Sequence, residues 1–162
     1  PYIYPLTLST TNSRRSRSGK TFETLIRIIF ESRKIPFGDQ KSLGKNFYAK
    51  NNLGKIVDMI VPSSEAYLKN RRETLIITMK TSLRERWAEV AEELERTSIP
   101  NIHLLTVDEN LSDNLIELMR NHNITLVVYD EIKNTKFPKQ SNVLGYTVFF
   151  EKEVPHYLAY LS

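Results

Sequence analysis

The sequence predicts an α/β fold, in which a mixed central sheet is sandwiched between flanking helices. Three helical patterns and four short apolar runs follow one another in the order helix, strand, strand, helix, strand, helix, strand, an order typical of this class. The 162 residues include 40% hydrophobic and 10% aromatic side chains, which is enough for one packed core. We therefore expect a single domain over residues 1–162, in which residues 1–17 form a basic N-terminal arm.

The first regular element is predicted to be a helix. Residues 1–13 contain two prolines and no helical period, so they predict an extended arm. From Ser18 to about Lys34, apolar side chains recur every three or four residues, which indicates an amphipathic helix; they are Phe22, Leu25, Ile26, Ile29 and Phe30. A proline and a glycine end this pattern, and residues 38–54, with three glycines, predict a loop or irregular hairpin.

Two strands and a second helix are predicted next. Lys55–Val61 and Glu73–Lys80 are short runs rich in apolar, branched residues, a composition that favours strands. The helix after them extends to about Arg96. Its predicted buried stripe is Leu83, Trp87, Val90, Ala91 and Leu94.

The remaining elements complete the alternation. Ile102–Val107 and Ile124–Tyr129 predict strands, and Asn114–Arg120 predicts a helix between them. Val143–Phe150 fits either a strand or the start of a helix, and Pro155 is expected to interrupt the tail.

The charge is unevenly distributed along the chain. The net charge of +4 is the sum of two unlike halves. Residues 1–86 carry 17 basic and 7 acidic side chains, giving +10, whereas residues 87–162 carry 6 and 12, giving −6. The first 22 residues hold no acid and four bases, which predicts contact with a polyanion such as nucleic acid, a solvated basic tail being the alternative; the bases are Arg14, Arg15, Arg17 and Lys20.

Composition excludes several classes of function. The chain has no cysteine, which rules out disulfides, thiol catalysis and cysteine-based zinc sites. It has no apolar run near 18 residues, so no membrane span is expected. A soluble, intracellular protein is the expectation. Because the sequence begins with Pro1 rather than Met, we also expect it to be part of a longer chain.

Two charged residues stand in otherwise apolar strands. Asp58 is flanked by Val57 and Met59, and Lys80 ends the next strand. A charge in such a place requires a partner or a metal ion, and adjacent strands bring these two residues to one edge of the sheet. The simpler interpretation is an inter-strand salt bridge. The alternative gains support from Glu93, which helical geometry places on a flank of the buried stripe, because Asp58 and Glu93 together would offer the oxygen ligands that magnesium prefers. Glu23, next to the stripe of the first helix, is a further candidate.

These residues resemble a known catalytic core. The spacing of Asp58, Lys80 22 positions later and Glu93 13 positions after that is similar to type II restriction endonucleases of the PD-(D/E)XK superfamily, in particular the group built on the EcoRII catalytic domain, which cuts CC/GG-type sites. Most superfamily members have an acid two residues before the lysine, where this chain has Thr78. The resembling group takes the acid from the following helix, where Glu93 stands.

The resemblance extends over about residues 13–130. The segment SRRSRSGKTFE resembles the basic stretch that leads to the group's first acidic residue, so the resemblance implies a catalytic role for Glu23. VDMIVPSSEAY resembles the strand with the catalytic Asp, although Val57 replaces the usual proline. Four to six residues after Lys80, the resemblance implies a triplet that reads bases in the major groove, a chemistry suited to Arg and Glu; the triplet is Arg84, Glu85 and Arg86.

The resemblance implies a magnesium-dependent endonuclease that hydrolyses both strands of double-stranded DNA as a homodimer. Asp58 and Glu93 would hold the metal, and the basic arm would contact phosphates. Two alternatives stay open: a structure-selective repair or recombination nuclease, and a non-catalytic DNA-binding module. The histidines are expected to be structural or exposed, and four tyrosines are expected to pack rather than stack on bases; these residues are His103, His122, His156, Tyr2, Tyr4, Tyr48 and Tyr67.

Overall fold

The fold is taken from a computed structural model that describes residues 19–39, 57–83, 87–97 and 99–161. Within these ranges the side chains of Glu93, Thr97 and Leu161 are outside the description. The sequence-based expectations for residues 1–18, 40–56 and 84–86 therefore lie outside the described residues.

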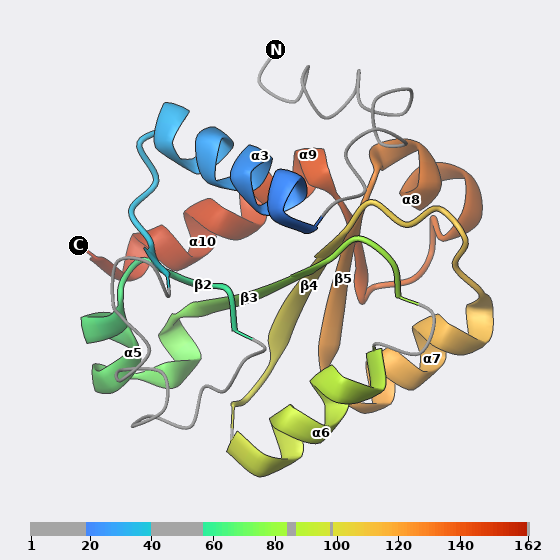
Figure 1. Ribbon diagram of the computed structural model, residues 1–162, viewed down its shortest axis with the longest axis horizontal. Coiled ribbons are helices and arrows are strands. Elements are labelled where there is room, and N and C mark those ends of the chain that lie inside the picture. Colours follow the sequence, from blue (N-terminus) through green and yellow to red (C-terminus); the bar gives the residue numbers. More distant parts are fainter. Residues whose placement is uncertain (1–18, 40–56, 84–86, 98, 162) are drawn as a thin grey trace.

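A six-stranded mixed sheet forms the centre of the molecule (Figure 1), with the strands in the order β1-β2-β3-β4-β5-β6. β1, β2 and β3 pair antiparallel, whereas β3 to β6 pair parallel. The strands are β1 (Gly38–Asp39), β2 (Met59–Val61), β3 (Leu75–Lys80), β4 (Ile102–Thr106), β5 (Ile124–Val128) and β6 (Val143–Gly145). The predicted mixed sheet is confirmed.

Helices cover both faces of this sheet (Figure 1). The long helix α3 and the C-terminal helix α10 lie on one side, and α6 and α7 lie on the other. The helices are α3 (Gly19–Ser32), α5 (Ser64–Lys69), α6 (Trp87–Thr97), α7 (Asp113–Asn121), α8 (Asp130–Lys136), α9 (Tyr146–Val148) and α10 (Val154–Leu158). Short 3₁₀ turns occur at η1 (Arg71–Glu73) and η3 (Ala159–Leu161), and a π-helical turn occurs at η2 (Phe149–Glu153).

The buried side chains form one continuous core on both faces of β3, β4 and β5. These three strands are buried along almost their whole length, as is expected for inner strands that helices cover on both sides. The predicted stripe of α3 is buried except for Leu25, which is partly exposed. In α6, Val90, Ala91 and Leu94 are buried, so the periodicity identified both buried helical faces correctly.

The structure corrects several predicted boundaries. Leu83 is buried but lies before α6 rather than in it, because it follows the end of β3 directly and packs there as part of a connecting segment. The Lys55–Val61 prediction is too long, since the strand begins only at Met59. Gly38–Asp39, at the start of the segment predicted as a loop or irregular hairpin, forms a short strand that pairs antiparallel with β2. The short helices α5 and α8 were not predicted, because six or seven residues contain too few turns for a helical period to be visible.

The C-terminal tail contains a strand followed by helical turns. Val143–Phe150 was predicted as either strand or helix start, and it holds both, β6 and then α9. Pro155 was expected to interrupt the tail, and this expectation is wrong. It lies in the first turn of α10, directly after the π-helical turn, where a missing N–H is tolerated.

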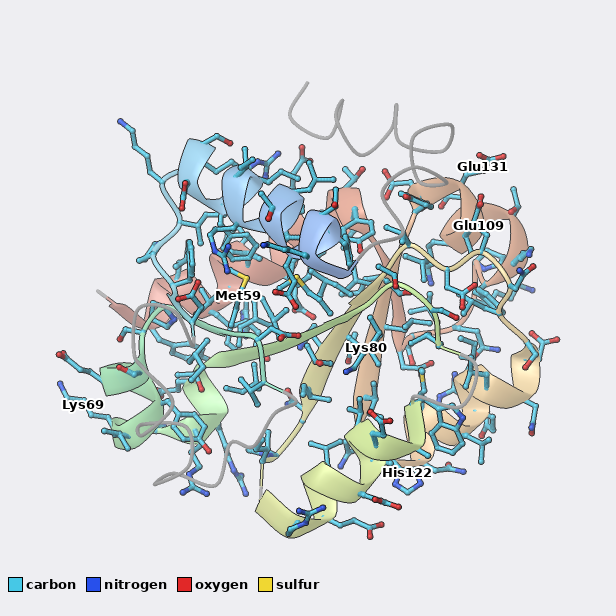
Figure 2. All side chains as sticks on the ribbon, in the orientation of Figure 1. Met59, Lys69, Lys80, Glu109, His122 and Glu131 are labelled. Carbon is cyan, nitrogen blue, oxygen red and sulfur yellow. The ribbon has the colours of Figure 1, made fainter. Side chains whose placement is uncertain are left out.

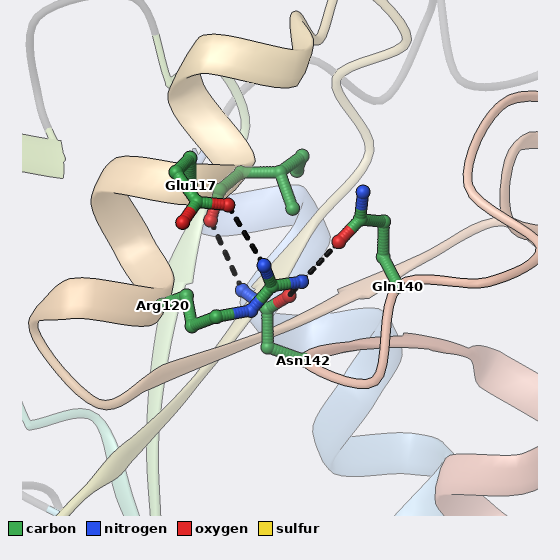
Figure 3. Close-up of polar contacts among 5 residues, drawn as sticks. Glu117, Arg120, Gln140 and Asn142 are labelled. Carbon is green, nitrogen blue, oxygen red and sulfur yellow. Dashed lines mark hydrogen bonds and ion pairs between the residues drawn. The ribbon is translucent and has the colours of Figure 1, made fainter.

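A polar network fixes α7 against the segment before β6 (Figure 3). The Arg120 guanidinium donates to Glu117 at 2.7 Å, to Asn142 at 3.1 Å and also to Gln140. Asn142 in turn donates to the Ile116 carbonyl at 3.1 Å. One arginine thus ties the carboxyl-terminal half of a helix to the entry of the last strand. None of the described helices is both long and apolar enough to span a membrane.

Candidate active site

Asp58 and Lys80 lie at the same edge of the sheet, as predicted. β2 and β3 run antiparallel, so the residue just before β2 and the last residue of β3 must lie at one end of the pair. Asp58 immediately precedes β2 and Lys80 ends β3, and both are partly buried. In the view of Figure 2, the Lys80 side chain lies between the ribbons of β3 and α6.

The Asp58 carboxylate is held by the backbone of β3. The Asp58 N–H donates to the Ile77 carbonyl at 2.8 Å. Asp58 Oδ2 accepts the Met79 N–H at 2.7 Å and the Thr78 hydroxyl at 3.4 Å. Backbone and carboxylate of Asp58 are therefore both hydrogen-bonded to β3, and this arrangement fixes the position of the carboxylate.

Burial raises the pKa of Asp58 from 3.8 to about 7, in spite of the hydrogen bond from the Met79 N–H. The neighbouring negative charge of Glu23 raises this pKa further, and the positive charge of Lys80 lowers it. The Asp58 carboxyl, just before β2, is thus within electrostatic reach of Glu23 in α3 and of Lys80 at the end of β3.

Asp58 and Lys80 do not form the inter-strand salt bridge that was the simpler interpretation of these two charges. Among the described residues, no ion pair joins these two side chains, and both hydrogen bonds to the Asp58 carboxylate reach the same oxygen, Oδ2. Oδ1 is therefore not occupied by a donor from the described part of the chain. A carboxylate that is buried, fixed and only half engaged has the character of a ligand rather than of a structural ion pair.

Thr78 occupies the position at which most PD-(D/E)XK proteins have an acid. Its side chain is fully buried and its hydroxyl donates to Asp58. Because threonine is uncharged, the negative charge near this position comes from Asp58 and Glu23. Among the side chains that the structure describes, three or more His, Asp or Glu residues nowhere converge as metal ligands do.

Several predicted site residues lie outside the described residues in whole or in part. Glu93 belongs to the described helix α6, but its side chain is outside the description. Lys20 is exposed at the start of α3. The residues fully outside are Arg14, Arg15, Arg17, Arg84, Glu85 and Arg86.

The predicted structural histidines and one tyrosine can be placed. His103 is buried in β4 and its Nε2 lies 2.9 Å from Glu153 Oε2, which is a structural contact. His122 caps α7 and His156 is exposed in α10. Tyr67 is fully buried and packs in the core. Tyr2, Tyr4 and Tyr48 are outside the described residues.

Sequence reasoning missed Asp108. This residue follows β4 at the same edge of the sheet, and its carboxylate accepts the Leu83 N–H at 2.9 Å. The available signal was its position directly after a predicted buried strand, at the carboxyl end, where functional side chains gather in α/β sheets.

Comparison with known proteins agrees with this fold. The mixed sheet with its flanking helices is the fold of the PD-(D/E)XK restriction endonucleases. Residues 3–150 match the family described as EcoRII C terminal, and the chain belongs to that family.

Two curated relatives and two solved structures are similar to the chain. It is 41% identical to the type II restriction enzyme SsoII of Shigella sonnei over 90% of this chain, and 26% identical to the type II restriction enzyme EcoRII of Escherichia coli over 81%. The structure of metal-depleted Ecl18kI in complex with uncleaved DNA is similar to this chain with a TM-score of 0.73 and 37% identity. The match covers 97% of this chain and 50% of the Ecl18kI chain. The PspGI–substrate DNA complex, at 22% identity, matches 96% of this chain and 67% of its own, with a TM-score of 0.68, and supports the fold.

The chain spans only part of the curated relatives. It covers 48% of SsoII and 31% of EcoRII. The similarity therefore concerns about half of SsoII and a third of EcoRII, and not the whole of either enzyme.

Proposed function

We propose that this protein is a type II site-specific DNA endonuclease, which hydrolyses phosphodiester bonds in both strands of DNA at a CC/GG-type site. The observation that carries the proposal is the fixed, half-engaged Asp58 carboxylate at the edge that also holds Lys80 and Glu23. Membership of the EcoRII C-terminal family and the likeness to restriction enzymes support it. We propose the cytoplasm of a prokaryote as its place of action.

The donor set at this edge fits a magnesium ion. Asp58 offers Oδ1 without a protein donor among the described residues, and the nearby Glu23 supplies a second carboxylate charge. Asp58 and Glu93 would hold the ion directly, with Glu23 supporting it or Lys80. Hard carboxylate oxygens are the ligands that magnesium prefers. When bound, magnesium would polarise a phosphoryl oxygen and lower the pKa of a water molecule.

Lys80 and Asp58 have separable tasks in phosphodiester hydrolysis. Water attacks phosphorus in line with the leaving oxygen, and negative charge accumulates on the phosphoryl oxygens in the transition state. The Lys80 ammonium, held at the end of a buried strand, would stabilise that charge without having to reorganise. Backbone and hydroxyl donors from β3 keep the Asp58 carboxylate in one orientation, which preserves the geometry of the site.

Sequence recognition is assigned to the triplet Arg84, Glu85 and Arg86. Arginine donates to O6 and N7 of guanine and glutamate accepts from N4 of cytosine in the major groove, which suits a CC/GG half-site. Arg14, Arg15, Arg17 and Lys20 would contact phosphates and set the register without reading bases. Two strands of a near-palindromic site require two active centres, so a twofold homodimer is proposed.

Two variants of the full-length protein test this proposal against a non-catalytic DNA-binding module. Lys80→Ala should abolish cleavage with magnesium and leave sequence-specific binding, measured in calcium, unchanged. Arg84→Ala should remove specific binding, so that cognate and unrelated duplexes are bound alike. Cleavage by Lys80→Ala at the wild-type rate would show that the assigned active site is wrong.

A structure-selective nuclease is the second candidate for the same edge. Such an enzyme would need Asp58, Lys80 and Glu93 but not the base-reading triplet. It would cut branched or flapped DNA in preference to a linear duplex, whatever the sequence. Comparing a branched substrate with a linear duplex of the same sequence separates the two, since only the restriction proposal predicts efficient cleavage of the linear duplex.

A further inference from the structure

Asp108 joins the loop after β4 to the segment that leaves β3. Its Oδ2 accepts the Leu83 N–H at 2.9 Å, and its Oδ1 accepts the Asn110 N–H at 2.9 Å. The two oxygens of one carboxylate thus accept hydrogen bonds from two backbone N–H groups that are 27 residues apart in the chain. Bonds from N–H groups to a charged acceptor are stronger than neutral ones, so this contact restrains the Leu83 backbone.

The buried core in turn restrains Asp108. Its N–H donates to the Thr106 hydroxyl at 3.0 Å, and Thr106 is fully buried in β4. The Thr106 carbonyl accepts the hydroxyl of buried Tyr146 at 2.9 Å. In the β3–β4 ladder, Thr106 is the direct partner of Lys80. The carboxylate that holds Leu83 is therefore tied to the strand position beside the proposed catalytic lysine.

The segment between Lys80 and Leu83 has two fixed ends. Lys80 is fixed in the β3–β4 ladder, and Leu83 is fixed by complete burial of its side chain and by the Asp108 contact. Only Thr81 and Ser82 lie between them, so the separation of the two ends can vary by only a few ångströms. The residue that follows Leu83 in the sequence is Arg84.

We propose that Asp108 is a positioning residue for DNA sequence discrimination. By holding the Leu83 N–H, it fixes the point from which the Arg84-Glu85-Arg86 triplet starts, relative to Lys80. This inference rests on the proposed function, in which the triplet reads bases and Lys80 serves hydrolysis. Bidentate base contacts depend on accurate placement of their donors.

The test compares three variants of the full-length protein. Asp108→Ala removes both contacts. Asp108→Asn is nearly isosteric but has only one acceptor oxygen, so it can accept from Leu83 or from Asn110 and not from both. Glu109→Ala is the matched control, because the Glu109 side chain makes no hydrogen bond or ion pair with the described residues, and its carbonyl contact with Lys136 survives the change.

The substrates are synthetic duplexes that carry either the site mapped from wild-type cleavage ends or that site with one CC/GG base pair exchanged. We expect Asp108→Ala to reduce the ratio of kcat/KM for the two duplexes by about tenfold or more, because each misread base pair is worth on the order of a tenfold factor. Asp108→Asn should lie between this variant and the wild type, and Glu109→Ala should match the wild type.

The outcomes separate this inference from the proposed function. If the DNA ends produced by the wild type share no sequence, the proposed function itself is contradicted, and the positioning role that rests on it is overturned with it. Where Arg84→Ala loses discrimination but both Asp108 variants keep the wild-type ratio, only the positioning role is overturned. An equal fall of kcat/KM on all duplexes, with the ratio unchanged, also overturns it, because that result indicates a purely structural role. If Asp108→Ala does not fold, the ratio measured for Asp108→Asn decides alone.

Discussion

The Asp58 carboxylate, just before β2, accepts the N–H of Met79 in β3 at 2.7 Å. A backbone donor of the inner strand thus orients the acid, while the same burial raises the pKa of Asp58 to about 7. The hydrogen bond from Met79 favours the charged carboxylate and burial disfavours it, and burial has the larger effect on the pKa. The Asp58 carboxyl is therefore fixed in one orientation but is still partly protonated near neutral pH. Two predictions follow from this combination.

Asp58→Asn should stabilise the metal-free protein at high pH. The folded pKa of Asp58 is raised above the value of 3.8 for an unfolded chain, so its contribution to stability is fully present below about pH 4 and is lost as the pH rises through about 7. Over the full shift the loss amounts to about 4 kcal/mol at most. In chemical denaturation with EDTA, Asp58→Asn should exceed the wild type at pH 8 and match it at pH 4. A wild type at least as stable as the variant at pH 8 would contradict this account.

Magnesium should compete with a proton at Asp58. Because the pKa of Asp58 is about 7 without metal, binding of the ion must release close to one proton below that pH and progressively less above it. Titrating the full-length protein with magnesium alone, in buffers of different ionisation enthalpy, measures the released protons. Asp58→Asn serves as the control and should release none from this group. Proton release that does not change between pH 6 and pH 8 would be inconsistent with the site.

Glu153→Gln should lower stability at neutral pH. The hydrogen bond from His103 holds the pKa of Glu153 below its usual value, so the carboxylate stabilises the fold above about pH 4.5 and loses this effect as the pH falls through the folded pKa. The variant should lose about 1 kcal/mol at pH 7, and the difference should shrink as the pH falls below 4.5. Glu151→Gln, an exposed change in the same helical turn, should have no effect. Equal stability curves for the two variants would refute the role of the pair.

Gly145→Ala should destabilise the junction of β6 and α8. A methyl group at this position would collide with the Asp130 carboxylate and come within 3.2 Å of the Asp130 Cα. That carboxylate accepts the Thr147 N–H at 3.0 Å and the Thr147 hydroxyl, so it cannot move without losing both. We expect a loss of about 1–3 kcal/mol in the free energy of unfolding. In the Asp130→Ala background the additional loss should be smaller, and full additivity of the two changes would argue against the collision.

Periodicity and apolar runs predicted the helices and strands that form the core. The stripes of α3 and α6 and the strands β3, β4 and β5 are long enough for their patterns to be clear. The two-residue strand β1 and the short helices α5 and α8 were not identified, because they depend on pairing and on less than two helical turns rather than on a repeated pattern. Pro155 was misjudged because its place in a first turn depends on the preceding π-helical turn.

For the site, the sequence predicted that Asp58 and Lys80 share an edge, and it identified Glu23 as a neighbour. It did not predict how the edge is built. The salt-bridge alternative was wrong, because the Asp58 carboxylate accepts from the Met79 N–H and the Thr78 hydroxyl, donors that no sequence pattern reveals. Asp108 was missed for the same reason, since its partners are the N–H groups of Leu83 and Asn110. The roles of Glu93 and of the Arg84-Glu85-Arg86 triplet stay predictions.

The most direct test of the central claim is to sequence the DNA ends that the full-length protein produces from a mixed-sequence plasmid in magnesium. The account predicts a small set of discrete fragments whose ends all share CC/GG flanks, and no cleavage by the Lys80→Ala variant in the same digest. Ends without a common sequence, or an unchanged plasmid, would contradict the claim that this edge of the sheet is the active site of a site-specific endonuclease.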